Sequence, residues 1–165
     1  MPATNDPSYL EILSATVGYL DLSNYQVFAQ NVWLLRGTGS VRGSDRLLPG
    51  GGIRTYPRRV NLTQVTLPLV INGAVNTDGT AYSGNACDHM WSILDTLLSE
   101  LWVDTGTLTA PTKVAPIRLA QLHSTAYGTK TGYVRVVEIT PSGTIDGTSV
   151  LRADLVLELP NGRLS

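Results

Sequence analysis

Apolar and polar residues alternate along several short stretches of this chain, and this alternation most limits the folds that it can adopt. From Ser149 to Leu159, every second position starting at Leu151 is Leu or Ala. Between Val60 and Ile71 the same spacing recurs in Val65, Leu67, Leu69 and Ile71. Because successive side chains of a strand point to opposite faces, this spacing predicts strands with one buried face.

Further segments have the length and composition of strands: 9–13, 25–35, 114–123 and 132–140. Turn signals separate the segments: Asn72-Gly73, Asp78-Gly79, Pro141-Ser142-Gly143 and Asp146-Gly147. Pro68 has no backbone N–H to give to a neighbouring strand. We therefore expect the strand around it to lie at a sheet edge, at least at that point.

One segment, about 86–103, has helical spacing instead. Asn85 can cap its first turn, and Asp88 brings a carboxylate close to the exposed amides there. Apolar residues then recur every three or four positions and predict one wide buried stripe: Met90, Trp91, Leu94, Leu97, Leu98, Leu101 and Trp102. The stripe predicts that Trp91 and Trp102 are buried.

These elements predict a mainly β fold, a sandwich or barrel with one flanking amphipathic helix. A length of 165 residues suits a single domain over 1–165. The stretch from Gly37 to Pro57 contains six glycines and two prolines and shows no helical or strand period. It is predicted to be a long Arg/Gly-rich loop, and loops of that length in compact domains usually have a function.

The composition favours a protein that assembles. Charged residues make up 15% of the chain, against a usual share of about 25%, which suggests that partners cover part of the surface. A net charge of −1 predicts no general affinity for nucleic acid or for acidic membranes, and it does little to keep copies apart. No apolar run approaches the roughly 18 residues that would span a bilayer.

The residue types that carry catalysis are sparse. His89 and His123 are the two histidines, and neither has a zinc-binding spacing to Cys, Asp or Glu. Gly50-Gly51-Gly52 lacks the Lys-Ser/Thr of a phosphate-binding loop, and Cys87 is the single cysteine. We therefore expect no catalytic residue, no cofactor and no metal, and both histidines are predicted to be surface residues or satisfied by hydrogen bonds.

Charge is segregated along the chain. Six arginines and one acid lie between Arg36 and Arg59, whereas five acids and no Lys or Arg lie between Asp78 and Asp104. The arginines could bind nucleic acid, fold onto the acidic helix of the same copy, or reach the acidic surface of a neighbour. The third interpretation is favoured and predicts a head-to-tail subunit interface. Its residues would be Arg42, Asp45, Arg46, Arg54, Arg58, Arg59, Asp88, Asp95 and Glu100.

Several blocks of the chain resemble small tail proteins of long-tailed phages that infect actinobacteria, the minor or distal tail proteins. The most specific block is Arg42-Gly43-Ser44-Asp45-Arg46-Leu47-Leu48-Pro49-Gly50. Weaker blocks follow: Tyr56-Pro57-Arg58-Arg59-Val60, Leu67-Pro68-Leu69-Val70-Ile71-Asn72-Gly73, Asp78-Gly79-Thr80 and 151–163. The resemblance extends from about Tyr9 to Arg163.

The resemblance implies a tail-tube-like fold and a structural role in the virion. Copies of the chain would form a hexameric ring at the tail tip that joins the tail-tube protein to the hub or baseplate and other minor tail proteins. The protein would be made in the host cytoplasm. It would not bind nucleic acid specifically, because a lumen that passes DNA should not hold it.

Alternatives remain open from the residues alone. The nearest is a tail-tube or tail-terminator subunit. A sugar-binding β-sandwich is another, and it requires Trp33, Trp91 and Trp102 to be exposed. An enzyme that depends on His89 or His123 is the least favoured.

Overall fold

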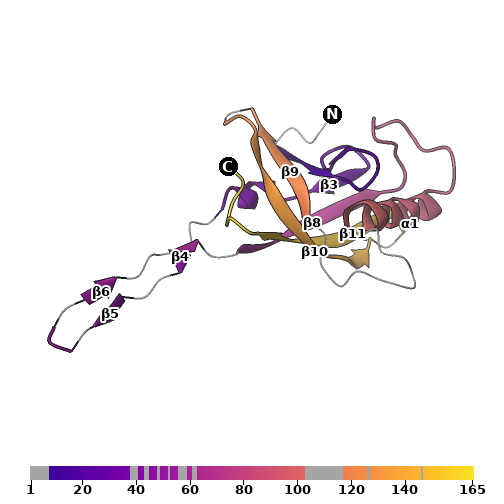
Figure 1. Cartoon of the computed structure of the whole chain (residues 1–165). Coiled ribbons are helices and arrows are strands. Elements are labelled where there is room, and N and C mark those ends of the chain that lie inside the picture. Colours follow the sequence, from indigo (N-terminus) through magenta and orange to yellow (C-terminus); the bar gives the residue numbers. More distant parts are fainter. Residues whose placement is uncertain are drawn as a thin grey trace, which may run out of the picture.

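The computed structural model describes most of the chain. The residues described are 8–37, 41–42, 45–47, 49–51, 53–55, 59–60, 63–102, 117–125, 127–145 and 147–165. This part of the molecule consists mainly of one large antiparallel sheet, one α-helix and a projecting arm of four short strands (Figure 1).

The large sheet has seven strands, each antiparallel to its neighbours. In spatial order they are β2 (Tyr19–Asp21), β1 (Ser8–Leu13), β9 (Ile117–Ser124), β10 (Lys130–Thr144), β11 (Val150–Leu159), β8 (Thr63–Asn72) and β3 (Val27–Ala29). The predictions of a mainly β fold and of strands near 9–13, 60–71 and 149–159 are confirmed.

The two edges of this open sheet approach each other. Residues that follow β2 meet β3 through a bridge between Ser23 and Phe28, and the N–H of Ala29 donates to the carbonyl of Leu22 at 2.7 Å. The sheet therefore curls into a barrel-like shape, with this short bridge between β2 and β3. Such curling is the usual way for a twisted sheet to bury one of its faces.

Alternate residues of every long strand point to the inside of the curl and form one core. On β8 and β11 the inward positions are those that the alternation predicted, and Leu67 and Leu155 are fully buried. The rest of the strand core comes from the same face of the neighbouring strands: Leu10, Ile12, Val27, Ala29, Ala120, Leu122, Val134, Val136 and Ile139.

The helix closes this core. It begins at Ala86 and continues as α1 (Ala86–Leu97), then as one π-helical turn, η2 (Leu98–Trp102). The side-chain oxygen of Asn85 accepts hydrogen bonds from the N–H groups of Cys87 at 3.0 Å and of Asp88, so the predicted cap is confirmed. The buried residues are Met90, Ile93, Leu94, Leu97 and Leu101.

Trp91 was predicted to be buried, and this prediction is wrong. Its side chain is 45% exposed, and Ile93, which the predicted stripe left out, is buried instead. The helix packs with a face centred nearer to Ile93 and Leu97, which leaves Trp91 on the outer side. The side chain of Trp102 lies outside the described part of the chain.

The segment 25–35 also differs from the prediction of one long strand. Only Val27–Ala29 is extended, and a 3₁₀ turn, η1 (Val32–Arg36), follows. Asn31 lies between them with a φ of 58°, in the left-handed region that Asn tolerates better than most residues. That residue ends the strand and turns the chain.

The segment predicted to be a loop contains short strands. β4 (Val41–Arg42) pairs with β7 (Arg59–Val60), and β5 (Asp45–Leu47) pairs with β6 (Ile53–Thr55), each antiparallel. Figure 1 shows β5 and β6 well outside the body of the molecule. We call these four strands the arm.

Candidate functional site

The arm brings arginines together in pairs. Arg42 lies directly opposite Arg59 in β4 and β7, and Arg46 lies directly opposite Arg54 in β5 and β6. Like charges in directly opposed positions destabilise a two-stranded ribbon unless an anion neutralises them. The arm is therefore suited to binding an acidic surface. Asp45 lies opposite Thr55, and Arg58 lies outside the described residues.

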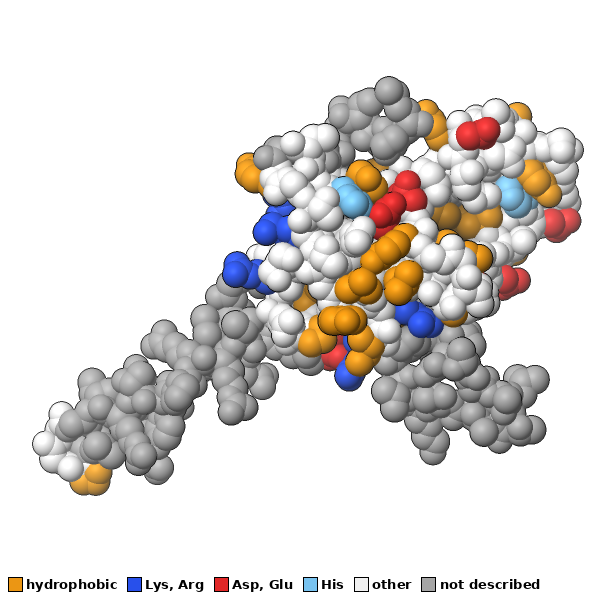
Figure 2. Space-filling view, turned by 45° about the horizontal axis from the view of Figure 1, so that its top comes forward, with side chains coloured by type: hydrophobic (Ala, Val, Ile, Leu, Met, Phe, Trp, Pro, Cys, Tyr) orange, Lys and Arg blue, Asp and Glu red, His pale blue; other side chains and the backbone are white. Residues whose placement is uncertain are grey.

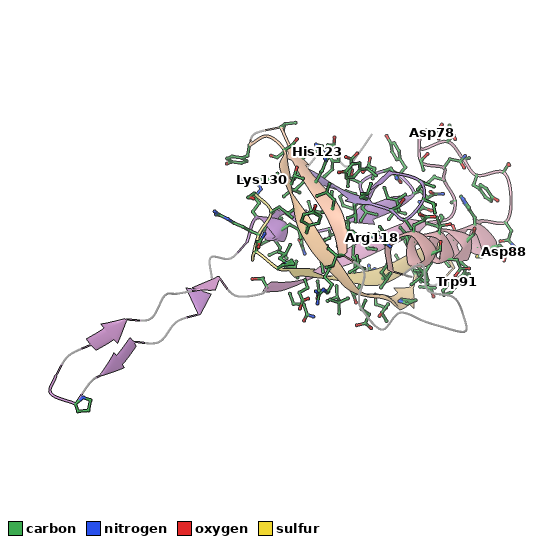
Figure 3. All side chains as sticks on the ribbon, viewed as in Figure 1. Asp78, Asp88, Trp91, Arg118, His123 and Lys130 are labelled. Carbon is green, nitrogen blue, oxygen red and sulfur yellow. The ribbon has the colours of Figure 1, made fainter. Side chains whose placement is uncertain are left out.

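An acidic surface is present on the outer side of α1. Asp88 and Asp95 are both exposed, and Trp91 lies between them at a spacing that places all three on one helix face. Figure 3 shows Asp88 and Trp91 on this helix. We call Asp88, Trp91 and Asp95 the acidic face. Both carboxylates therefore face the solvent.

Glu100 belongs to a different arrangement. Its carboxylate accepts a hydrogen bond from the Thr16 hydroxyl at 2.6 Å and another from the Thr16 N–H at 3.0 Å. These bonds lower the pKa of Glu100, because they favour the ionised form. Glu100 therefore ties the loop after β1 to the end of the helix, and the structure does not bring it together with Asp88 and Asp95.

A groove of about 220 Å³ lies beside the acidic face, between α1 and the residues around β2 and β3. Its apolar lining is contributed by Leu20, Val27, Ile93 and Leu97. Polar residues form the rest of the lining: Asn24, Gln26, Thr77, His89, Ser92 and Thr96. The sequence gives no sign of this groove, because its lining comes from three distant parts of the chain.

His89, on the groove, is fully hydrogen-bonded. The Gln26 amide nitrogen lies 3.1 Å from Nε2 of His89 and can only donate, so Nε2 accepts. Nδ1 then carries the proton and donates to the carbonyl oxygen of Gly73 at 2.9 Å. The imidazole also stacks on the Tyr82 ring, 3.7 Å between ring centroids. These contacts hold the imidazole in a structural role.

His123 lies on the outer face of the sheet in a second hydrogen-bonded cluster. Its Nε2 is 2.8 Å from a carboxylate oxygen of Glu11, and its Nδ1 is 3.0 Å from the Thr129 hydroxyl. A hydroxyl, an imidazole and a carboxylate therefore meet, which the sequence did not indicate. None of these three side chains lines the groove beside α1. They link β1, β9 and the turn after β9, and His123 also stacks on Tyr9.

Within the described ranges, no three His, Cys, Asp or Glu side chains lie close enough together to hold a metal ion. No helix in the described part of the chain is long and apolar enough to cross a bilayer.

Hydrophobic side chains gather on the outer face of the sheet (Figure 2). Tyr133 is 63% exposed and lies opposite Leu119, and Ile117 on the same strand as Leu119 is 51% exposed. Leu13 and Tyr19, paired across β1 and β2, continue this row. An exposed row of this kind is typical of a surface that contacts another protein.

The exposed tryptophans do not form a common platform. Trp33 is 56% exposed in η1, whereas Trp91 is exposed on α1. These two elements lie far apart in Figure 1. Two of the three tryptophans that the sugar-binding alternative requires to be exposed are therefore exposed, but they do not share one surface.

No family model matches the chain, and no curated protein is detectably similar to it.

Proposed function

We propose that this chain is a structural subunit that associates with copies of itself to form a ring at the distal end of a phage tail. The observation that carries the proposal is the presence of two complementary surfaces on one chain. These are an arm with opposed arginine pairs and a helix with an exposed acidic face. The resemblance of the Arg42–Gly50 block to distal tail proteins supplies the biological setting.

The direction of the arm supports association between copies over folding onto the same copy. In Figure 1, β5 and β6 extend from the opposite side of the body to α1. An arm that points away from its own acidic face can reach the same face on a neighbour. Repetition of this head-to-tail contact closes a ring when the rotation between subunits allows it.

The outer hydrophobic row supplies a further contact surface. A ring subunit at a tail tip also needs surfaces for unlike proteins, here the tail-tube protein on one side and the hub or baseplate on the other. Tyr133, Ile117 and Leu119 lie on the sheet and outside the arm and the acidic face. This leaves the row free for such a partner while the arm is engaged.

A tail-tube or tail-terminator subunit is the second candidate, since it would use the same two surfaces. Tube subunits stack without limit, whereas a distal ring is a single closed layer. Long tubes in electron micrographs of the purified protein would favour the tube subunit. Rings of one size would favour the distal ring.

Light scattering at low and high salt tests the self-association. The reversal Arg58→Glu with Arg59→Glu is expected to lower the assembled mass at low salt and to leave the monomer folded, because it reverses the charge of Arg59 in β7 and of the residue before it in the sequence. High salt should weaken the wild-type assembly through screening. Arg152→Glu with Arg163→Glu changes the net charge equally at exposed positions outside the arm and serves as the control. Unchanged assembly in the arm variant would remove the arm from the interface.

A further inference from the structure

We infer that Tyr127 of one copy inserts into the groove beside α1 of the next copy. The guanidinium of Arg36, which stacks on the Tyr127 ring, would then lie against the acidic face of that next copy. The inference rests on the proposed self-association. It names two surfaces on the body of the molecule that would make the head-to-tail contact.

Tyr127 is prominent on the surface. It lies in the turn between β9 and β10 and is 71% exposed, more than any other large hydrophobic residue in the described part of the chain. The guanidinium carbon of Arg36 lies 4.6 Å from the centroid of its ring, which is a cation–π contact. Tyrosine and arginine are also the residues that most often fill pockets at the centre of protein interfaces.

Arg36 is held in place by contacts to two other elements. It lies at the end of η1, and its Nη2 donates a hydrogen bond to the Ser8 hydroxyl of β1 at 3.1 Å. Its stacking on Tyr127 adds the turn between β9 and β10. A guanidinium has five N–H donors, so the bond to Ser8 leaves donors for a carboxylate. The ring and the charge are therefore already positioned, which lowers the entropy that binding would cost.

The groove matches a tyrosine in size and in polarity. Its volume of about 220 Å³ is below the roughly 300–1,000 Å³ of sites that hold small-molecule ligands, so it suits one large side chain. A tyrosine ring is apolar and ends in a hydroxyl, and the groove has an apolar lining with polar residues beside it. The hydroxyl of Thr96, in this polar lining, donates to the carbonyl of Ser92 at 2.9 Å. Its oxygen can still accept a hydrogen bond from a phenol.

The acidic face borders the groove along Ser92. Asp88 comes four residues before Ser92 and Asp95 comes three residues after it, so the three are neighbours on the helix surface. Ser92 itself lines the groove. A guanidinium that stacks on a ring in the groove therefore comes close to two carboxylates, and opposite charges attract.

A second copy of this chain is the occupant that these surfaces favour. One chain carries both an aromatic ring with a cation on it and a groove with an acidic border. In Figure 1, the turn between β9 and β10 and the helix α1 lie on opposite sides of the body, so a chain cannot fill its own groove. A contact between opposite sides repeats head to tail.

The arm is compatible with this contact. It follows η1 in the chain and leaves the body on the side away from α1 (Figure 1). Arg36 lies at the end of η1, directly before the arm begins. The arm and the stacked pair of Tyr127 and Arg36 would therefore engage the same neighbour.

Truncation of Tyr127 tests the docking. Tyr127→Ala is expected to need at least about tenfold more protein for half-maximal assembly in light scattering, because it removes an aromatic anchor. Tyr127→Phe keeps the ring and should stay within about threefold of the wild type, since it loses one hydrogen bond. Tyr133→Ala removes an equally exposed ring from the outer face of the sheet and should assemble normally. Thermal unfolding of each variant checks that it remains folded.

A mixing experiment tests whether the groove is the partner of Tyr127. Thr96→Trp, at an exposed position, places a large ring in the groove and should impair assembly as Tyr127→Ala does. Ser92→Trp takes its place if that variant does not fold. The Tyr127→Ala chain keeps its groove, and the Thr96→Trp chain keeps its Tyr127. At a concentration at which each is monomeric alone, an equimolar mixture should give a 1:1 dimer and nothing larger in native mass spectrometry.

The outcomes separate the docking from the self-association. Impaired assembly of both variants together with the 1:1 dimer supports the docking. A wild-type chain that assembles while Tyr127→Ala assembles equally well, or a mixture without the 1:1 dimer, would overturn the docking and leave self-association intact. A wild-type chain that stays monomeric at high concentration would overturn both.

Discussion

At the level of single residues, the carboxylate of Glu100 holds the loop after β1 against the end of the helix. Its two oxygens accept hydrogen bonds from the hydroxyl and the N–H of Thr16. The backbone carbonyl of Glu100 accepts a hydrogen bond from the N–H of Ala15 at 3.0 Å. Thr16 is 84 positions away in the chain. No local pattern connects the two residues, so the sequence placed Glu100 with the interface acids, whereas the structure gives it an internal partner.

Glu100→Gln is expected to lower the free energy of unfolding at neutral pH. The folded chain lowers the pKa of Glu100, so its contribution to stability is present above the ordinary pKa of Glu and is lost as the pH falls through the lowered pKa. The difference between the wild type and the variant should therefore shrink in acid. Urea unfolding at a series of pH values measures it, with Asp95→Asn as the control. A difference that is independent of pH would contradict this role.

For the other residues of the acidic face, helical spacing predicts the exposure of some and not of others. The exposure of Asp88 and Asp95 follows from helical spacing, because the positions opposite a buried stripe face water. The exposure of Trp91 does not follow from helical spacing, because by spacing alone Trp91 fits the apolar stripe as well as Ile93 does. The choice between them depends on which side of the helix meets the curled sheet.

At the level of elements, Gly73 allows the end of β8 to approach α1 closely. A Cβ on Gly73 would lie 2.0 Å from the carbonyl oxygen of Ala86 and 2.7 Å from the backbone nitrogen of Met90. Both neighbours are backbone atoms of the helix and cannot turn aside. The turn signal Asn72-Gly73 was evident in the sequence, but this contact was not.

Gly73→Ala is therefore expected to destabilise the fold by about 3 kcal/mol, because the helix must shift from the sheet to accept the methyl group. Chemical denaturation of the purified variant gives the value. Ala74→Ser, at the exposed neighbouring position, should leave the stability close to that of the wild type. Equal stability of Gly73→Ala and the wild type would show that the close approach is not needed.

Long periodic elements were predictable and short ones were not. β8, β11 and α1 are long enough for their patterns to show, whereas β2 and the arm strands are two or three residues long. Pro68 shows a finer limit. β8 has a neighbouring strand on each side. The N–H of Gln30, just past the end of β3, donates to the carbonyl of Pro68. The missing N–H of Pro68 therefore faces a position where the pairing of β3 with β8 has ended.

At the level of the whole molecule, the fold combines one buried core with the arm and the acidic face, the two surfaces that we propose bind other copies. The fold class followed from alternation and one helical stripe. The curl of the sheet, the groove and the direction of the arm did not, because they depend on how distant segments pack. The account's central claim, association into a ring, depends on these features.

Native mass spectrometry of the purified chain at low ionic strength tests that claim most directly. A single closed species with the mass of a hexamer is expected, and it should dissociate as the salt concentration rises. A spectrum that holds only the 17.7 kDa monomer, even from concentrated protein, would contradict the account.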